Sequence, residues 1–258
     1  MAQLLENKTA VIYGAGGAIG SAVARAFAHE GAHVHLTSRR LSSVEKIVAE
    51  IAAVGGKATA AEVDALDERA VEDDLGTITK DGRTIDVSFN AVGFDEVQGV
   101  PLVDLSLRDF AYAVDSWSQT VFLTSRAAAR RMTAQGSGVI LTVKPPAAGT
   151  ALASGFGAAV ATVESISLTL AAEVGPKGVR VLVLQPNALP ESATLQESFR
   201  KYASGLGIKP EDALAGMADT TMLKRLPTLE EFSNVASFVA SDKASALTGS
   251  VIKVDCGT

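Results

Sequence analysis

The feature that most constrains the fold of this chain is a glycine-rich turn close to its start, Tyr13-Gly14-Ala15-Gly16-Gly17-Ala18-Ile19-Gly20. It follows a short β-branched run and precedes a pattern typical of a helix. Glycine permits a tight turn and lets the backbone approach a pyrophosphate, which then lies on the helix N-terminus and its partial positive charge. A glycine cluster can also be an ordinary strand-to-helix turn. Its place between the first strand and the first helix favours phosphate binding, by the residues Gly14, Gly16, Gly17, Ala18, Ile19 and Gly20.

The rest of the chain alternates short β-branched runs with longer helical patterns. We expect strands at Thr9–Tyr13, His33–Thr37, Ala58–Glu62, Val87–Phe89, Val139–Val143, Val179–Leu184 and Val251–Val254. We expect helices at Ala18–Glu30, Ser42–Val54, Glu68–Ile78, Leu107–Thr133, Ala151–Val174 and Leu229–Ser241. This order predicts an α/β fold, a single Rossmann-type, doubly wound parallel sheet of about seven strands with helices on both faces. Right-handed crossovers bring the carboxyl ends of the strands to one edge, where ligands of such sheets bind.

Length and composition fit one domain over residues 1–258. The chain has 258 residues, of which 47% are hydrophobic and only 5% aromatic, so Ala, Val, Leu and Ile must build the core. Such a core suits a parallel sheet that is buried on both faces. The segment Leu189–Pro227 breaks the alternation, because it is long and mixes polar and apolar residues without a clear pattern. We expect it to form a lid over the site, since long loops of this kind are usually functional or mobile.

Charge and residue counts argue against several classes of partner. The net charge of −6 would repel nucleic acid or an anionic membrane surface. Cys256 is the only cysteine, which excludes an internal disulfide and a cysteine-based zinc site. His33 and His35 share one face of the second predicted strand, but no third ligand accompanies them, so we expect no metal. Met1–Lys8 lacks the order of a signal peptide and there is no long apolar run, so we expect a cytoplasmic protein.

The end of the second predicted strand bears on which dinucleotide the chain would hold. An NAD site usually places Asp or Glu about 20 residues after the glycines, where the acid grips the ribose 2′-hydroxyl. This chain has Thr37-Ser38-Arg39-Arg40 there, and its next acid is Glu45. Ser38 can donate to a 2′-phosphate and the Arg39 guanidinium can bind it through two hydrogen bonds, although both arginines could also be solvated surface charges. The pattern favours NADP over NAD.

Further motifs resemble those of the short-chain dehydrogenase/reductase family from about Leu5 to Gly257. The family's Thr-Gly-x-x-x-Gly-x-Gly loop is similar to Tyr13–Gly20, with Tyr13 and Ala18 departing from it. Its adenine-contacting Asp-Val pair looks like Asp64-Ala65, and its Asn-Asn-Ala-Gly turn looks like Asn90-Ala91-Val92-Gly93. Its Pro-Gly turn after the sixth strand appears as Pro186-Asn187, and the sequence around Thr248-Gly249 and Asp255-Cys256-Gly257 is similar too. The resemblance implies cofactor contacts at Asp64, Ala65, Asn90, Ala91, Gly93 and Pro186.

The same resemblance implies that the family's catalytic residues are replaced. Family enzymes use a Ser, a Tyr and a Lys four residues after the Tyr, usually with an Asn on an earlier helix. Counting back from Leu170-Ala171-Ala172-Glu173 puts Phe156 at the Tyr position and Val160 at the Lys position, and no Tyr-x-x-x-Lys occurs in the chain. The Ser position falls on Val143 or Lys144, and the Asn position on Trp117.

Two of these residues allow more than one interpretation. Lys144 is the ionisable group expected at the carboxyl end of the fifth strand, where it could stabilise an oxyanion or donate a proton, or simply extend to solvent. Trp117 could line the substrate pocket or attract a cation through its ring face, but core filling between two helices is the interpretation that we favour.

Three functions therefore remain open. The first is an NADP(H)-binding oxidoreductase with a non-standard active site, acting on a substrate that needs little enzyme-supplied acid, such as an iminium or a strongly activated alkene. The second is a catalytically silent cofactor-binding regulator or partner subunit. The third is a non-redox isomerase or cyclase that uses Lys144. By analogy with the family, we expect a homodimer or homotetramer assembled through the helices Leu107–Thr133 and Ala151–Val174; the substrate is not identified.

Overall fold

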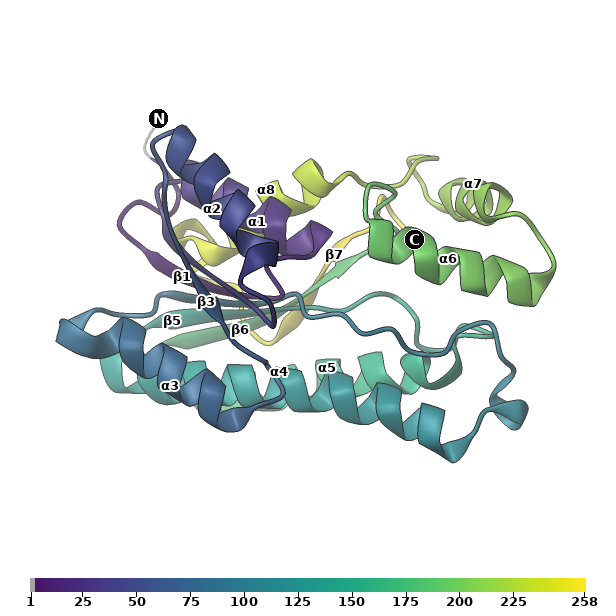
Figure 1. The fold of residues 1–258 in the computed structure, drawn as a ribbon, viewed down its shortest axis with the longest axis horizontal. Coiled ribbons are helices and arrows are strands. Elements are labelled where there is room, and N and C mark those ends of the chain that lie inside the picture. Colours follow the sequence, from purple (N-terminus) through teal and green to yellow (C-terminus); the bar gives the residue numbers. More distant parts are fainter. Residues whose placement is uncertain (1–2) are drawn as a thin grey trace.

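The structure, a computed structural model, describes residues 3–258 apart from the side chains at positions 81, 194 and 195. Within that range, seven parallel strands form one sheet in the order β3-β2-β1-β4-β5-β6-β7 (Figure 1). The strands are β1 (Thr9–Tyr13), β2 (His33–Ser38), β3 (Lys57–Glu62), β4 (Val87–Asn90), β5 (Gly138–Val143), β6 (Val179–Pro186) and β7 (Ser250–Val254). The predicted doubly wound parallel sheet is confirmed, and β1 and β4 lie at the point where the strand order reverses.

Helices cover both faces of the sheet. They are α1 (Ala18–His29), α2 (Ser42–Ala53), α3 (Glu68–Thr79), α4 (Leu107–Gln135), α5 (Ser154–Val174), α6 (Ala193–Leu206), α7 (Pro210–Thr220) and α8 (Leu229–Ala240), with short 3-10 turns η1 (Lys80–Gly82), η2 (Leu102–Asp104), η3 (Gly175–Lys177) and η4 (Asp242–Ala244). Figure 1 shows α1, α2 and α8 on one face and α3, α4 and α5 on the other. Each face has its own apolar core, built around residues such as Phe27, Phe89 and Phe232 on one side and Val11, Ile85 and Ile140 on the other.

Two sequence predictions were wrong in this part of the fold. The segment Leu189–Pro227 is not irregular, because it contains α6 and α7. Helix α5 begins at Ser154, not at Ala151, because Leu152 has a φ of 62°. Non-glycine residues rarely adopt this left-handed conformation, which a continuous right-handed helix cannot include.

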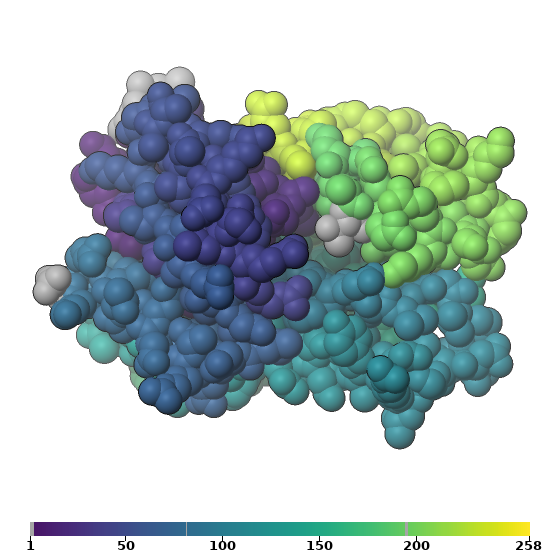
Figure 2. Space-filling view, viewed as in Figure 1, coloured from purple at the N-terminus to yellow at the C-terminus, as the bar shows by residue number. Residues whose placement is uncertain are grey.

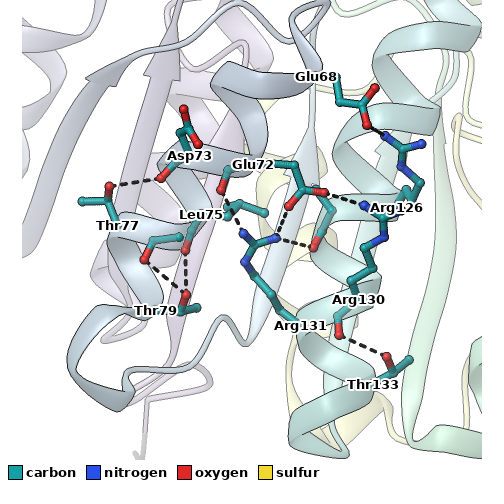
Figure 3. Close-up of polar contacts among 12 residues, drawn as sticks. Glu68, Glu72, Asp73, Leu75, Thr77, Thr79, Arg126, Arg130, Arg131 and Thr133 are labelled. Atoms are coloured by element: carbon teal, nitrogen blue, oxygen red, sulfur yellow. Dashed lines mark hydrogen bonds and ion pairs between the residues drawn. The ribbon is translucent and has the colours of Figure 1, made fainter.

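A network of ion pairs joins α3 to α4 (Figure 3). Glu72 Oε2 accepts from Arg131 Nη1 at 2.7 Å and Glu72 Oε1 accepts from Arg130 Nη1 at 3.0 Å. Glu68 pairs with Arg126 one turn away. Burial acts to raise the pKa of Glu72, but the hydrogen bonds and charges of the two arginines outweigh it and leave that pKa below its ordinary value. The network therefore fixes α4, whose N-terminal half carries Trp117, against the body of the fold.

Helix α5 together with η3 (Ser154–Lys177) is long and apolar enough, by length and composition alone, to cross a membrane, with a mean hydropathy of 1.4. Core helices of globular proteins pass the same test, and one such helix is weak evidence for a span. In this structure α5 packs against α4 and β6.

Candidate active site

The glycine turn forms a cradle between β1 and α1. Gly14 has a φ of 73°, and a Cβ on it would lie 2.7 Å from the carbonyl oxygen of Ala91, so only glycine fits there. A Cβ on Gly20 would lie 2.4 Å from the oxygen of Gly14, so this glycine lets α1 pack onto the turn. Gly16 and Gly17 are exposed, and α1 begins without a side-chain cap or an acidic residue in its first turn. Its N-terminal N–H groups and their partial charge therefore suit an anion.

The end of β2 carries two cations, Arg39 and Arg40. Arg39 and Arg40 are exposed, and within residues 3–258 neither guanidinium makes an ion pair or a hydrogen bond. Ser38 Oγ lies 3.2 Å from Ser43 Oγ, which places two hydroxyls beside the arginines. The sequence analysis missed Glu62 at the end of β3, whose Oε2 accepts from the backbone N–H of Leu41 at 3.3 Å. Strand β3 pairs with β2, and Glu62 lies opposite Ser38. The strand register would therefore have predicted that this acid lies near the arginines.

The other predicted cofactor positions also lie at the carboxyl ends of the strands. Asp64 is exposed and Ala65 buried directly after β3, and Asp64 Oδ1 accepts from the N–H of Leu66 at 3.0 Å. Asn90 is buried at the end of β4, where its Nδ2 donates to Thr124 Oγ1 at 2.9 Å.

Asn90 Oδ1 accepts from the N–H of Val92 at 3.0 Å, which shapes the turn toward Gly93. Among the described atoms, a Cβ on Gly93 would meet nothing within 4 Å, so the space beside this turn is open. Ala91 donates its N–H to the oxygen of Tyr13 and so joins this turn to the glycine cradle, while Pro186 is buried at the end of β6.

At the positions expected for the family Asn and Tyr, the structure places two aromatic rings in contact. The centroids of Trp117 on α4 and Phe156 on α5 are 5.3 Å apart, and Phe94 packs edge-on against Trp117 at 6.0 Å. Tyr112 packs against Phe94 at 6.5 Å. Trp117 is buried, which fits the core-filling interpretation, yet its cluster lies beside the strand ends that a substrate would approach.

The positions expected for the family Lys and Ser are also apolar. Val160 on α5 is fully buried and packs with Ala147 and Ala153, while Val143 belongs to the core beneath the sheet. Lys144 follows β5, as expected, but its ammonium is not free. It donates to Glu164 Oε2 on α5 at 2.5 Å, and only 8% of its side chain is exposed. The interpretation in which Lys144 extends to solvent is therefore wrong.

A buried carboxyl group that the sequence analysis missed adjoins the aromatic cluster. Glu96 lies three residues after Gly93 and is only 5% exposed. Its Oε2 accepts from Trp117 Nε1 at 3.3 Å and its Oε1 accepts from Gln98 Nε2 at 2.9 Å. Burial raises the pKa of Glu96, against the opposing effects of these two hydrogen bonds and of the Lys201 charge. The sequence shows that an acid follows this strand. It does not show that the acid is buried, because the burial depends on α4 and α6.

Helix α6 covers this carboxyl edge. Gly99 and Gly205 meet backbone to backbone, since a Cβ on Gly205 would lie 2.4 Å from the oxygen of Gly99. Lys201 on α6 forms an ion pair with Asp95 in the same loop as Glu96. Figure 2 shows the α6–α7 segment (green) across from the N-terminal segments that carry the glycine turn (purple and blue).

The strained turn before α5 is tied to the same loop. The N–H of Gly99 donates to the oxygen of Leu152 at 2.9 Å, and Ser154 Oγ donates to the oxygen of Val100 at 2.8 Å. Non-glycine residues held at positive φ cluster at functional sites because the surrounding contacts must hold them there. The loop after β4 and the turn before α5 are therefore joined just ahead of Phe156.

The histidines lie outside this edge. His35 pairs with Asp74 Oδ1 at 2.9 Å and with Thr59 Oγ1 at 2.9 Å, which gives its ring a structural role. No cluster of three or more His, Cys, Asp or Glu residues that could hold a metal ion occurs among the described residues.

Comparison with known proteins agrees with this geometry. The family model described as enoyl-(acyl carrier protein) reductase matches residues 14–258. The chain belongs to the short-chain dehydrogenase/reductase family. It is 32% identical over 255 residues to the uncharacterized oxidoreductase YxbG of Bacillus subtilis (strain 168), covering 98% of this chain and 91% of that protein. This is the family and the oxidoreductase type that the sequence motifs predicted.

Solved structures of the family share the fold closely. The crystal structure of NAD+-bound xylitol dehydrogenase superposes with a TM-score of 0.91 at 24% identity, over 98% of this chain and 99% of that one. A 7α-hydroxysteroid dehydrogenase complexed with NADH and 7-oxo glycochenodeoxycholic acid gives a TM-score of 0.85 at 27% identity, over 99% and 96%. The short-chain dehydrogenase/reductase family binds NAD or NADP, and these relatives do not separate the two for this chain.

Proposed function

We propose that this member of the family is an NADP(H)-dependent oxidoreductase with a non-standard active site. The observation that carries the cofactor choice is the pair of unpartnered guanidinium groups, Arg39 and Arg40, beside the hydroxyls of Ser38 and Ser43. A 2′-phosphate brings about two negative charges and strong acceptors to that corner. Arginine binds such a group through parallel hydrogen bonds.

The residues of the cradle fit a dinucleotide. The turn Gly14–Gly20 and the start of α1 would hold the pyrophosphate, and Asp64 with Ala65 would lie at the adenine. Asn90–Gly93 and Pro186 would border the nicotinamide end. When bound, the nicotinamide supplies or accepts the hydride.

The active site is non-standard because Phe156 and Val160 offer neither a proton nor a charge, and Trp117 and Val143 offer no hydroxyl or amide. Loss of a general acid typically costs about 10²–10⁴ in rate, and loss of an oxyanion donor about 10²–10³. Ordinary ketones are therefore expected to be poor substrates. An iminium ion or a strongly activated alkene fits better, because its reduction needs little enzyme-supplied acid.

Fluorescence titration with NADPH and NADH tests the cofactor choice. We expect tighter binding of NADPH, and we expect Arg39→Ala to weaken NADPH binding about 10- to 100-fold, from the ~1.5–3 kcal/mol of a charged hydrogen bond. NADH binding should change little. Arg69→Ala, an exposed arginine on α3, is the matched control. Equal affinities for the two nucleotides, or an equal effect of Arg39→Ala on both, would refute the choice of NADP.

We also propose that the segment 189–227 acts as a lid and that the protein is a cytoplasmic homodimer or homotetramer. The lid proposal is supported by the contacts of α6 with the loop around Gly99. Light scattering on the purified protein tests the assembly; a monomer at working concentration would refute it.

A further inference from the structure

Glu96 is placed where a substrate proton donor is otherwise missing. It lies in the loop after β4, at the carboxyl edge of the sheet, and one of its oxygens is bonded to Trp117 at the position expected for the family Asn. Trp117 in turn contacts Phe156 at the position expected for the family Tyr. One ring therefore links the buried carboxyl group to the site of the lost hydroxyl.

We propose that Glu96 is the acid that protonates an imine substrate, and that the rings of Phe94, Trp117 and Phe156 hold the resulting cation. This inference rests on the proposed NADP(H)-dependent function. The nitrogen lone pair of the C=N bond takes the proton of the Glu96 carboxyl group, which leaves a carboxylate and an iminium ion. A hydride added to the iminium carbon gives a neutral amine, so the step consumes one proton and one hydride and needs no second donor. Solvent then returns the proton to Glu96.

The charges around the site favour a cation over an alkoxide. Aromatic faces attract cations, most strongly where water is excluded. Lys201, whose charge acts on Glu96, is already paired with Asp95. The iminium ion formed by this proton transfer lies beside the Glu96 carboxylate and gains it as a counter-ion.

Three side chains from three elements act on Glu96. The neutral side chains of Gln98 in its own loop and Trp117 on α4 donate hydrogen bonds to it. Lys201 on α6, which is paired with Asp95, supplies a positive charge. Burial is the largest effect on the pKa of Glu96 and raises it, which keeps the carboxyl group protonated further toward neutral pH.

The single tryptophan makes this protonation directly observable. Trp117 is the only tryptophan of the chain, and its Nε1–H donates to Glu96. Its fluorescence should change with pH at a midpoint above the ordinary range of a glutamate, and the change should vanish in Glu96→Gln. The amide keeps the size of the side chain and an oxygen that can accept from Trp117. A wild-type profile without such a midpoint, or the same profile in the variant, would overturn the proposal.

Kinetics with a matched substrate pair supply the second test. NADPH oxidation is followed with dihydroisoquinoline, whose nitrogen must gain a proton, and with its N-methyl cation, which needs none. We expect Glu96→Gln to lower kcat for the imine about 10²–10⁴-fold and for the N-methyl cation far less. The imine rate of the wild type should fall as the pH rises through the Glu96 pKa. Glu173→Gln, at an exposed position on α5, is the control and should match the wild type.

The outcomes separate this inference from the function on which it rests. If the wild type binds NADPH but reduces neither compound, or if Glu96→Gln affects both compounds equally, Glu96 is not the acid and the cofactor proposal stands. If the wild type does not bind NADPH, the proposed function fails and the inference fails with it. Loss confined to the imine supports both.

Discussion

The ion pair between Lys144 and Glu164 leads to a specific prediction about stability. Its two members differ in exposure, since 8% of the Lys144 side chain is accessible and 36% of the Glu164 side chain. Removing Glu164 leaves an ammonium group that water cannot easily reach. Removing Lys144 leaves a carboxylate that can be hydrated. The two single substitutions should therefore have unequal costs.

The expected loss of stability lies between the values for a fully buried ion pair and for an exposed one. Breaking a fully buried pair by removing one partner costs about 3–5 kcal/mol, while an exposed pair contributes about 0.2–1 kcal/mol. We expect Glu164→Gln to lower the free energy of unfolding by about 1.5–3 kcal/mol, from the buried limit discounted for the exposure of Glu164. Lys144→Met keeps the apolar stem and should cost less than ~1 kcal/mol. The double variant should lie close to Lys144→Met, because no buried charge is then left alone.

Urea unfolding followed by Trp117 fluorescence measures all three variants against the wild type. Their m-values should agree, so that the midpoints report stability. Equal costs for the two single variants, or a larger cost for Lys144→Met, would refute the reasoning. The same proteins test the catalytic role considered for Lys144: loss of turnover in Lys144→Met with unchanged folding would show that the ammonium acts in the reaction.

Three further changes should have distinct effects. Glu72→Gln should lower the free energy of unfolding by about 0.5–1 kcal/mol at neutral pH. Arg131 and its neighbour lower the pKa of Glu72 in the folded state, so this difference from the wild type should shrink as the pH falls below about 4.5. Thermal melts at several pH values measure it. Gly205→Ala should push α6 off Gly99 and increase hydrogen exchange in α6, since the new Cβ would lie 2.4 Å from a carbonyl oxygen. Val160→Lys should destabilise the protein by more than ~2 kcal/mol by calorimetry, because it places an unpaired charge at a fully buried position.

Much of the fold was predictable because its signals are local. The β-branched runs and the glycine turn determine β1, α1 and the sheet order around them, and the observed strands match the predicted ones to within two residues. Helix α7 also had a usable signal, since Pro210 begins it and Glu211 and Asp212 occupy its first turn. The sequence analysis did not use that signal, because it treated the whole segment Leu189–Pro227 as irregular. The start of α5 could not be predicted, because the left-handed φ of Leu152 is imposed by contacts with the loop around Gly99.

The candidate site also contains parts that local sequence signals predict and parts that depend on distant elements. The cradle and the arginines follow β1 and β2 directly, so their spacing in the sequence brings them together in space. Glu96 and Glu164 become relevant only through distant elements: α4 and α6 bury one, and Lys144 of the β5 edge binds the other. A sequence that lacks an acid at the expected position gives no indication of which other acid the fold has buried.

The proposed assignment of Trp117 and Phe156 to the family's Asn and Tyr positions is easier to understand for the two residues together than for each alone. A phenylalanine at position 156 keeps the ring and loses the proton, and a tryptophan at position 117 fills the space between the helices. An indole also has one polar atom, and in this structure its N–H is bonded to Glu96. Packed rings lower the local dielectric, which makes the neutral form of a neighbouring carboxyl group more stable than it is in water. Under the proposed assignment, the rings that offer no tyrosine proton thus create the conditions under which a buried glutamic acid can keep one.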